Sequence, residues 1–105
     1  MPYSVTDDQQ EKKLDGGKVR MNLLLSDMPD AILEIAKVLT FAVDVKGYKV
    51  RSWRDVSPFN ERYNAALYRH LNAIERGEVK DPESGLSHRA HAACCILFQL
   101  QVEVE

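Results

Sequence analysis

The chain has 105 residues, of which 45% are hydrophobic and 29% are charged, a balance typical of one folded domain and not of a disordered tail or a membrane segment. Its formal net charge is -2 at pH 7, so the overall charge does not draw the protein to nucleic acid or to anionic lipid. Any anionic ligand would have to be held by a local cluster of cations.

Cysteine usage indicates a reducing compartment. Cys94 and Cys95 are adjacent in an apolar segment, where neighbouring side chains of a helix point in different directions and cannot form an ordinary disulfide. We interpret both as reduced packing residues. The polar start of the sequence has no stretch typical of a signal peptide, and no run approaches the ~20 apolar residues of a membrane span. We therefore expect a cytoplasmic protein without a membrane partner.

The first part of the chain is polar and ends in the turn signal Asp15-Gly16-Gly17. We expect residues 1–17 to be a flexible lead-in and residues 18–105 to form a single helical domain. After the turn, Lys18 and Arg20 alternate with apolar residues before a short leucine run. Because no second convincing strand is present to pair with it, this segment is predicted to be an extended arm.

The first long helix is predicted over residues 29–46, with Ser26 and Asp27 as candidate caps, Pro29 in the first turn and Gly47 at its end. One apolar face accounts for packing within the subunit, and a second apolar stripe on the opposite side requires further cover. The first face comprises Ile32, Ile35, Ala36, Leu39, Ala42 and Val43, and the second stripe comprises Val38, Phe41 and Val45, with Glu34 beside them.

A second helix is predicted to begin with Ser57 as its cap and Pro58 at its first position, and to end near Arg76. His70 lies on its apolar face, so we expect this ring to point inward. Three arginines recur every seven residues along an adjacent edge: Arg62, Arg69 and Arg76.

The third helix follows an acidic, turn-rich loop. Pro82 excludes a helix through residues 78–85, and the helix is predicted from about Ser87 to Val102, as the most buried of the three. The fold class is therefore predicted to be all-α: a small bundle of about three main helices with an extended N-terminal arm. Because two helices have more apolar surface than one bundle covers, we expect oligomerisation to complete it, as a homodimer or homotetramer.

Acidic side chains are the first candidates for chemistry. Glu34 either pairs with Lys37 one turn on or binds a divalent metal, because carboxylate oxygens are natural donors to Mg²⁺ and Mn²⁺. In the loop, Glu78, Asp81 and Glu83 either are solvated charges or complete such a site. The spacing alone leaves both alternatives open.

The histidines are the next candidates. His70 is either a satisfied core residue or a functional group. His88 and His91 lie three residues apart and share a helix face, so they could ligate a metal together. Alternatively, His88 could hydrogen-bond Glu83 or Asp81 and fix the loop.

Phosphate binding would rely on Lys18 and Arg20 of the arm and on the arginine edge of the second helix. The alternative for that edge is a solvated helix face. The sequence has no glycine-rich phosphate loop, and neither cysteine has a histidine arrangement typical of a nucleophile. A covalent mechanism is therefore disfavoured.

An ordered series of motifs extends over about residues 18–100. The motifs are Lys18-Val19-Arg20, Leu23-Leu24, Ala36-Lys37-Val38-Leu39-Thr40-Phe41, Trp53, Arg62-Tyr63, Arg69-His70-Leu71, Gly77-Glu78, Asp81-Pro82-Glu83-Ser84-Gly85-Leu86, His88 and Ala90-His91-Ala92-Ala93-Cys94. This series resembles the phage-encoded dATP/dGTP diphosphohydrolase N-terminal-domain family, which is related in outline to the all-α MazG-like nucleotide pyrophosphohydrolases.

The resemblance implies an enzyme of phage nucleotide metabolism, located in the cytoplasm of the host cell, that hydrolyses dATP or dGTP to the monophosphate and pyrophosphate. It implies Mg²⁺ or Mn²⁺ as the cofactor, a purine deoxynucleoside triphosphate as the partner and no nucleic acid; zinc or iron is expected only in the competing metallohydrolase described below. By analogy, the metal ligands would be Glu34, Glu78 and Asp81, and the histidine spacing adds His88 as a fourth candidate.

The resemblance also implies which residues bind the substrate and which act as a base. Lys18, Arg20 and Arg69 would bind substrate, together with Trp53, and would stabilise developing charge. His70, His88 or His91 would act as a base or support the metal ligands.

Two other functions compete with this one. The first is a catalytically silent nucleotide-binding or assembly protein of the same fold. The second is a metallohydrolase that uses His70, His88 and His91 around a transition metal.

Overall fold

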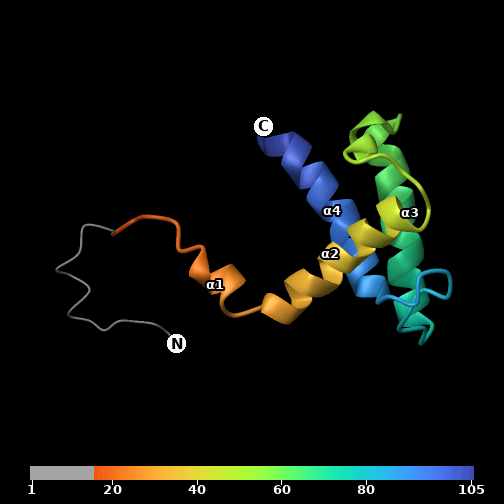
Figure 1. The fold of residues 1–105 in the computed structure, drawn as a ribbon, viewed down its shortest axis with the longest axis horizontal. Helices are drawn as coiled ribbons and strands as arrows, with labels where there is room; N and C mark the ends of the chain where they lie inside the picture. The colour runs from red at the N-terminus through yellow and green to blue at the C-terminus, as the bar shows by residue number, and fades with distance from the viewer. Residues whose placement is uncertain (1–15) are drawn as a thin grey trace.

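The computed structural model describes residues 16–105, and these residues form helices joined by loops, without a strand (Figure 1). The elements in chain order are α1 (Asn22–Leu25), α2 (Pro29–Asp44), the short 3-10 helix η2 (Ser52–Asp55), α3 (Phe59–Glu75) and α4 (His88–Val104). The prediction of an all-α fold with three main helices is confirmed. The predicted lead-in lies almost wholly outside the described residues. Within the described range, no helix is long and apolar enough to cross a membrane.

The predicted arm projects away from the other helices (Figure 1), but its second half is a single helical turn, α1, and not extended chain. In α1 the amide of Leu25 donates to the carbonyl of Met21 at 3.0 Å. Leucine is a good helix former, and no strand is present in the described residues to pair with an extended segment. Local hydrogen bonds therefore decide the conformation.

Helix α2 begins at Pro29, as predicted, and ends two residues earlier than predicted, at Asp44. The predicted caps Ser26 and Asp27 are wrong, because the N-cap is Met28 and it makes no side-chain cap hydrogen bond. Proline favours the first helical position and so fixes the preceding residue as the cap.

The start of α3 differs from the prediction, whereas the start of α4 agrees with it. The prediction of Ser57 as the cap of α3 is wrong, because Pro58 is the N-cap and makes no side-chain hydrogen bond. At α4, Ser87 is a true cap, and its hydroxyl accepts a hydrogen bond from the amide of Arg89 at 3.0 Å. The helix therefore starts where the sequence predicts.

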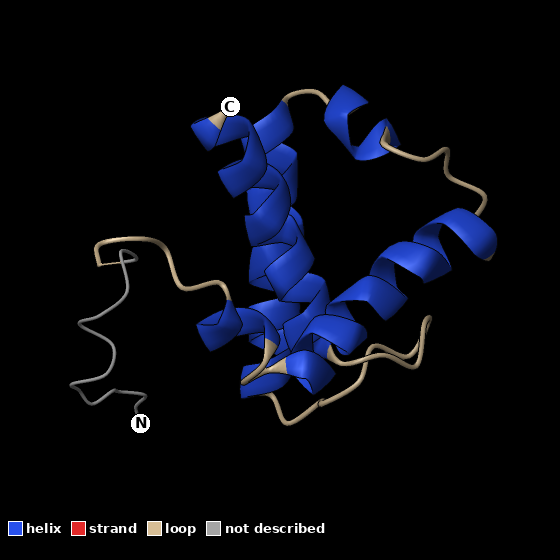
Figure 2. Ribbon diagram, turned by 60° about the vertical axis from the view of Figure 1, so that its left-hand side comes forward, coloured by secondary structure: helices blue, strands red, loops and turns tan. Residues whose placement is uncertain are grey.

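Helix α4 lies against both α2 and α3 (Figure 2), and it carries most of the buried core residues. Its two adjacent cysteines divide between the neighbours, because successive side chains of a helix point about 100° apart. Cys94 packs with Val38 of α2, and Cys95 packs with Leu67 of α3. Both cysteines are free and buried, and α4 is the most buried helix, as predicted.

The predicted division of α2 into an inner face and an outer stripe is wrong in part. The buried residue of α2 is Val38, which was assigned to the outer stripe, whereas Ala36 and Leu39 of the predicted inner face are exposed. Ile35 and Val38 of α2, three residues apart, pack in the same cluster as Cys94 of α4, and the remaining surface of α2 is half-buried or exposed.

Helices α3 and α4 form an antiparallel hairpin, which positions the candidate site. Tyr63, near the start of α3, faces Phe98 far along α4, with ring centroids 5.0 Å apart. His70, further along α3, meets His88 at the start of α4. The connection between the helices is a loop, as predicted, and an isolated antiparallel bridge between Lys80 and Ser87 closes it.

Candidate functional site

Three histidines meet where the end of α3 faces the first turn of α4. His70 Nδ1 lies 2.9 Å from His88 Nδ1. The ring of His91 stacks on that of His70, with centroids 4.7 Å apart and planes 13° from parallel. Because His88 and His91 are three residues apart on one helix, both face the hairpin partner. The sequence could not place His70 beside them, since that contact depends on the hairpin.

The acidic loop brings a carboxylate to the same place. The amide of Ser84 donates to Asp81 Oδ2 at 2.9 Å, a turn in which an Asp side chain replaces a backbone acceptor. Ser84 Oγ lies 2.7 Å from His91 Nε2, and Asp81 Oδ2 lies 3.8 Å from the same nitrogen. The turn therefore fixes Asp81 against the histidines.

His88 is buried, with 4% of its surface exposed, and its second ring nitrogen contacts an acid. His88 Nε2 lies 2.7 Å from Glu78 Oε1. The predicted partners Glu83 and Asp81 are therefore wrong for this hydrogen bond. The amide of His88 donates to the carbonyl of Val79 at 2.9 Å. This backbone hydrogen bond places the His88 ring beside Glu78.

Burial sets the charge of this cluster. It lowers the pKa of His70, and the neighbouring His91 and His88 lower it further. Burial likewise lowers the pKa of His91, against an opposing effect of Asp81. Partial burial acts to raise the pKa of Asp81, but the hydrogen bonds from Ser84 outweigh it and lower that pKa on balance. At neutral pH, His70 and His91 are thus neutral imidazoles beside an ionised carboxylate.

The donor atoms of this cluster fit a divalent cation. One donor atom each from His70, Asp81 and His88 lies within 4.8 Å of the others. Two of the four predicted metal ligands, Asp81 and His88, are therefore brought together. Glu78 contacts the far side of His88, and Glu34 lies on α2, paired with Lys37 at 2.8 Å.

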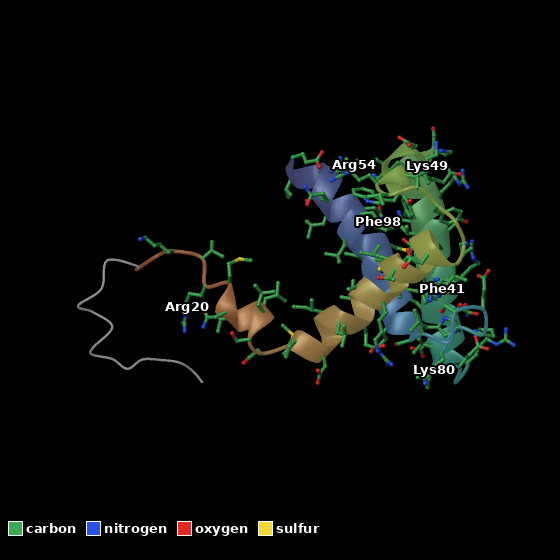
Figure 3. All side chains as sticks on the ribbon, viewed as in Figure 1. Arg20, Phe41, Lys49, Arg54, Lys80 and Phe98 are labelled. Carbon is green, nitrogen blue, oxygen red and sulfur yellow. The ribbon has the colours of Figure 1, made fainter. Side chains whose placement is uncertain are left out.

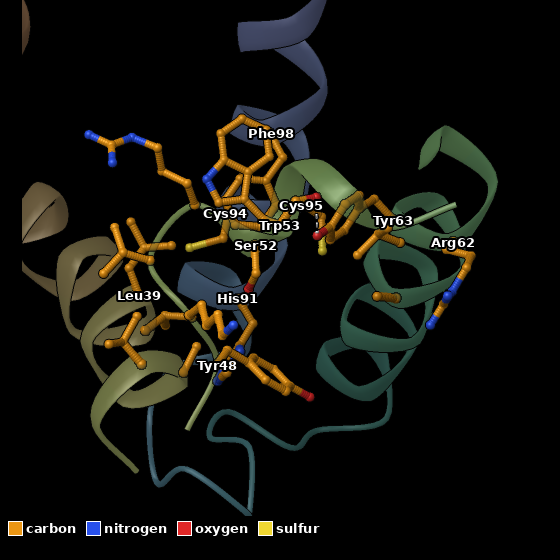
Figure 4. Close-up of a pocket in the computed structure, with 18 of the residues that line it drawn as sticks. Leu39, Tyr48, Ser52, Trp53, Arg62, Tyr63, His91, Cys94, Cys95 and Phe98 are labelled. Atoms are coloured by element: carbon orange, nitrogen blue, oxygen red, sulfur yellow. Dashed lines mark hydrogen bonds between the residues drawn. The ribbon is translucent and has the colours of Figure 1, made fainter. Parts of the chain in front are cut away.

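A pocket of about 670 Å³ lies beside the cluster, between α2, the segment 48–56, α3 and α4 (Figure 4). Its volume is within the range of roughly 300–1,000 Å³ that small-molecule sites occupy. His70 and His91 belong to the cluster and also line the pocket. Figure 4 shows Trp53 and Phe98 at one end of the pocket and His91 and Tyr48 at the other.

The polar lining of this pocket is cationic. Within the described part of the chain, the lining contains four Lys or Arg residues and no Asp or Glu. The four are Lys49, Arg51, Arg62 and Arg69. Arg51 has φ 69°, a left-handed conformation that costs a non-glycine residue roughly 1–3 kcal/mol. Such a lining attracts an anion, and its rings and aliphatic side chains accept an apolar or aromatic group.

Of the residues predicted to bind substrate, two line the pocket: Arg69 and Trp53. Trp53 stacks on Phe98 at 4.6 Å between centroids, and the Arg54 guanidinium lies 4.7 Å from its ring. Neighbouring side chains therefore already cover the faces of the indole ring. The ring thus forms a wall of the pocket more than a platform for stacking.

The other two predicted cations lie elsewhere. Figure 3 shows Arg20 on the arm, well apart from Phe98 and the helices around it. Lys18 is an exposed residue of the same arm, and neither residue lines the pocket.

Sequence reasoning missed the loop cations Lys49 and Arg51 and the hydroxyl of Ser84. The cations had a signal: basic residues recur through positions 46–54, directly after α2. Ser84 had none, because a serine in a Pro/Gly turn is ordinary turn chemistry, and its contact with His91 depends on how the loop folds back onto the first turn of α4.

Comparison with known proteins gives the family. The family profile described as dATP/dGTP diphosphohydrolase, N-terminal, matches residues 8–105. The chain belongs to this family. The predicted family is thus confirmed, and its outline relation to MazG-like enzymes stays a prediction.

One curated relative in this family is the dATP/dGTP diphosphohydrolase of Salmonella phage PMBT28. It is 34% identical over 86 residues, which make up 82% of this chain and 27% of the relative. The chain therefore spans about a quarter of the length of that protein. No solved structure matches the chain.

Proposed function

We propose that this domain binds purine deoxynucleoside triphosphates in the pocket and hydrolyses them to the monophosphate and pyrophosphate. One observation carries the proposal: the pocket is lined by four cations and several aromatic rings, has no carboxylate among the described residues, and adjoins a His/Asp cluster that fits a divalent cation. Membership of the dATP/dGTP diphosphohydrolase family supports the choice of substrate.

The triphosphate is assigned to the cationic side of the pocket. Arg62 and Arg69 lie seven residues apart on α3, hence on one side of that helix, and both line the pocket. A guanidinium group offers paired N–H donors that match phosphate oxygens. The base is assigned to the segment containing Tyr48. This residue is 54% exposed and Lys46 Nζ lies 5.5 Å from its ring centroid, so its aromatic surface is accessible to a purine.

The chemistry needs an activated water beside the bound phosphates. A divalent cation at the cluster would neutralise the triphosphate and lower the pKa of a bound water. His70 and His88 would hold that cation, so proton transfer is assigned to His91. Its Nε2 lies 2.7 Å from the Ser84 hydroxyl, which can donate or accept, and 3.8 Å from Asp81 Oδ2, which only accepts. We assign the proton of the neutral ring to Nε2, on the side of this carboxylate, which leaves Nδ1 to accept a proton from water.

We also infer that the domain assembles with copies of itself. The second half of α4 exposes a row of large apolar side chains, and α2 exposes others. Leu97 is 45% exposed and Leu100 is 46% exposed, although their helix is the centre of the fold. Monomeric proteins rarely leave such contiguous apolar surface uncovered, and a second copy covers it most simply.

The binding proposal is tested with Trp53, the single tryptophan of the chain. Because this ring is a wall of the pocket, binding of dATP or dGTP should change its fluorescence. Arg69→Met should weaken binding by roughly tenfold or more, as expected for a charge-assisted phosphate contact of about 1.5–3 kcal/mol. The matched control is Arg76→Met, one heptad further along the same arginine row but outside the pocket lining.

Equal affinity of both arginine variants and the unchanged chain would overturn the assignment of the pocket. Tight binding without pyrophosphate release would instead favour the silent nucleotide-binding protein.

A further inference from the structure

The cluster at the start of α4 has more nitrogen donors than a magnesium site needs. We propose that His70 Nδ1, His88 Nδ1 and a carboxylate oxygen of Asp81 bind a first-row transition metal ion of the Zn²⁺ class, and that Glu78 acts as a positioning residue behind His88. This inference shares the metal site of the proposed function, but it depends on neither the substrate nor the reaction.

The hydrogen bonds of His88 determine which of its nitrogens can bind the ion. A carboxylate accepts and does not donate, so the contact of 2.7 Å to Glu78 Oε1 places a proton on His88 Nε2. In the neutral ring the lone pair is then on Nδ1, which lies 2.9 Å from His70 Nδ1. A carboxylate that fixes the tautomer of a histidine from behind is the usual support of a metal-binding imidazole.

Two imidazole nitrogens this close can reach one ion. Zn–N bonds are about 2.0–2.1 Å long, so nitrogens 2.9 Å apart can both contact a shared cation. Without a cation, His70 Nδ1 must donate to His88 Nδ1, because two lone pairs at this distance repel. Metal binding therefore moves the proton of neutral His70 from Nδ1 to Nε2. The third donor atom, from Asp81, completes a set within 4.8 Å.

The donor types decide the class of metal. Mg²⁺ prefers an octahedral set of oxygens and rarely uses imidazole, whereas two imidazoles with one carboxylate suit zinc and neighbouring transition ions. His88 is buried, and its Nε2 is held by Glu78 Oε1 at 2.7 Å, so its ring is fixed in place. The ion adjoins the pocket, since His70 also lines it, and three protein donors leave positions for water or a ligand.

The test uses the whole chain, freed of metal by a chelator, with Co²⁺ as the probe. One equivalent of Co²⁺ should give a visible d–d absorption band and raise the melting temperature. Zn²⁺ should remove the band stoichiometrically, and millimolar Mg²⁺ should not. Absence of a saturable Co²⁺ signal, or displacement by Mg²⁺ as readily as by Zn²⁺, would overturn the proposal.

Variants assign the ligands. Asp81→Asn keeps the acceptor for the Ser84 amide, and His70→Gln changes a half-buried ring. Each should therefore fold and lose Co²⁺ affinity by at least about tenfold. Glu78→Gln should weaken binding by roughly 10- to 100-fold, as removal of a supporting partner does. Glu34→Gln is the matched control, because Glu34 pairs with Lys37 and lies outside the cluster.

Unchanged Co²⁺ affinity in both Asp81→Asn and His70→Gln would show that the ion binds elsewhere. Neither readout involves nucleotide, so a failure here leaves the Trp53 binding test of the proposed function untouched. Loss of nucleotide binding alone would likewise leave the metal site standing.

Discussion

Arg51 offers a test in which backbone and charge can be separated. This residue lines the pocket with φ 69°, and its carbonyl accepts the amide of Arg54 at 3.1 Å. A residue with a Cβ in this left-handed conformation is strained by roughly 1–2 kcal/mol. Glycine avoids that strain, but it makes the unfolded chain more flexible and so costs roughly 0.5–1 kcal/mol of folding free energy. Arg51→Gly should therefore be about 1 kcal/mol more stable than Arg51→Ala.

The two variants share the loss of the guanidinium, so they should share a loss of affinity. Arg51 is exposed, and an exposed cation contributes about 1 kcal/mol to phosphate binding, or roughly a fivefold change in Kd. In thermal denaturation, Arg51→Gly should melt roughly 4–8 °C above Arg51→Ala, while both bind dATP with the same weakened affinity in the Trp53 fluorescence titration. Equal melting temperatures would refute the backbone argument, and affinity unchanged in both would refute the contact with the anion.

Three further outcomes follow from the same structure. Burial raises the pKa of Cys94 to about 12, so above the ordinary pKa of 9.0 the unfolded chain loses the thiol proton while the native state keeps it. The free energy of unfolding should therefore fall as the pH rises from about 9 to 12. Urea midpoints at pH 8 and 10.5 should show a smaller fall in Cys94→Ala than in the unchanged chain. Light scattering at micromolar concentration should show a dimer or larger assembly, and Leu97→Glu on the exposed side of α4 should shift it towards monomer; a monomeric unchanged chain would contradict the assembly. His91→Gln should lower turnover by roughly 10²- to 10⁴-fold at saturating metal with unchanged Co²⁺ affinity, whereas turnover near that of the unchanged chain would exclude His91 as the base.

Local chemistry explains which parts of the fold could be predicted. Pro29, Gly47 and the loop around Pro82 delimit helices through backbone geometry that is present in the sequence itself. The packing face of α2 could not be predicted, because Val38 is buried by where α4 crosses and not by the periodicity of α2. The predicted caps of α2 and α3 are wrong for a local reason. In each case a proline sets the start of the helix, so that Met28 and Pro58 are the N-cap residues.

The candidate site shows the same limit. The turn at Asp81 and the shared face of His88 and His91 follow from short-range spacing. The contact of His70 with His88 comes from residues 18 positions apart in the chain and depends on the register of α3 against α4. Periodicity on a single helix has no information about that register.

Product identification tests the central claim most directly. The whole chain, supplied in separate experiments with Mg²⁺, Mn²⁺ and Zn²⁺, would be incubated with each of the four deoxynucleoside triphosphates, and the products separated by ion-exchange chromatography. The proposed function predicts dAMP or dGMP together with pyrophosphate from the purine substrates, and loss of both products in Asp81→Asn. Intact purine triphosphates under every metal condition, or release of orthophosphate in place of pyrophosphate, would contradict it.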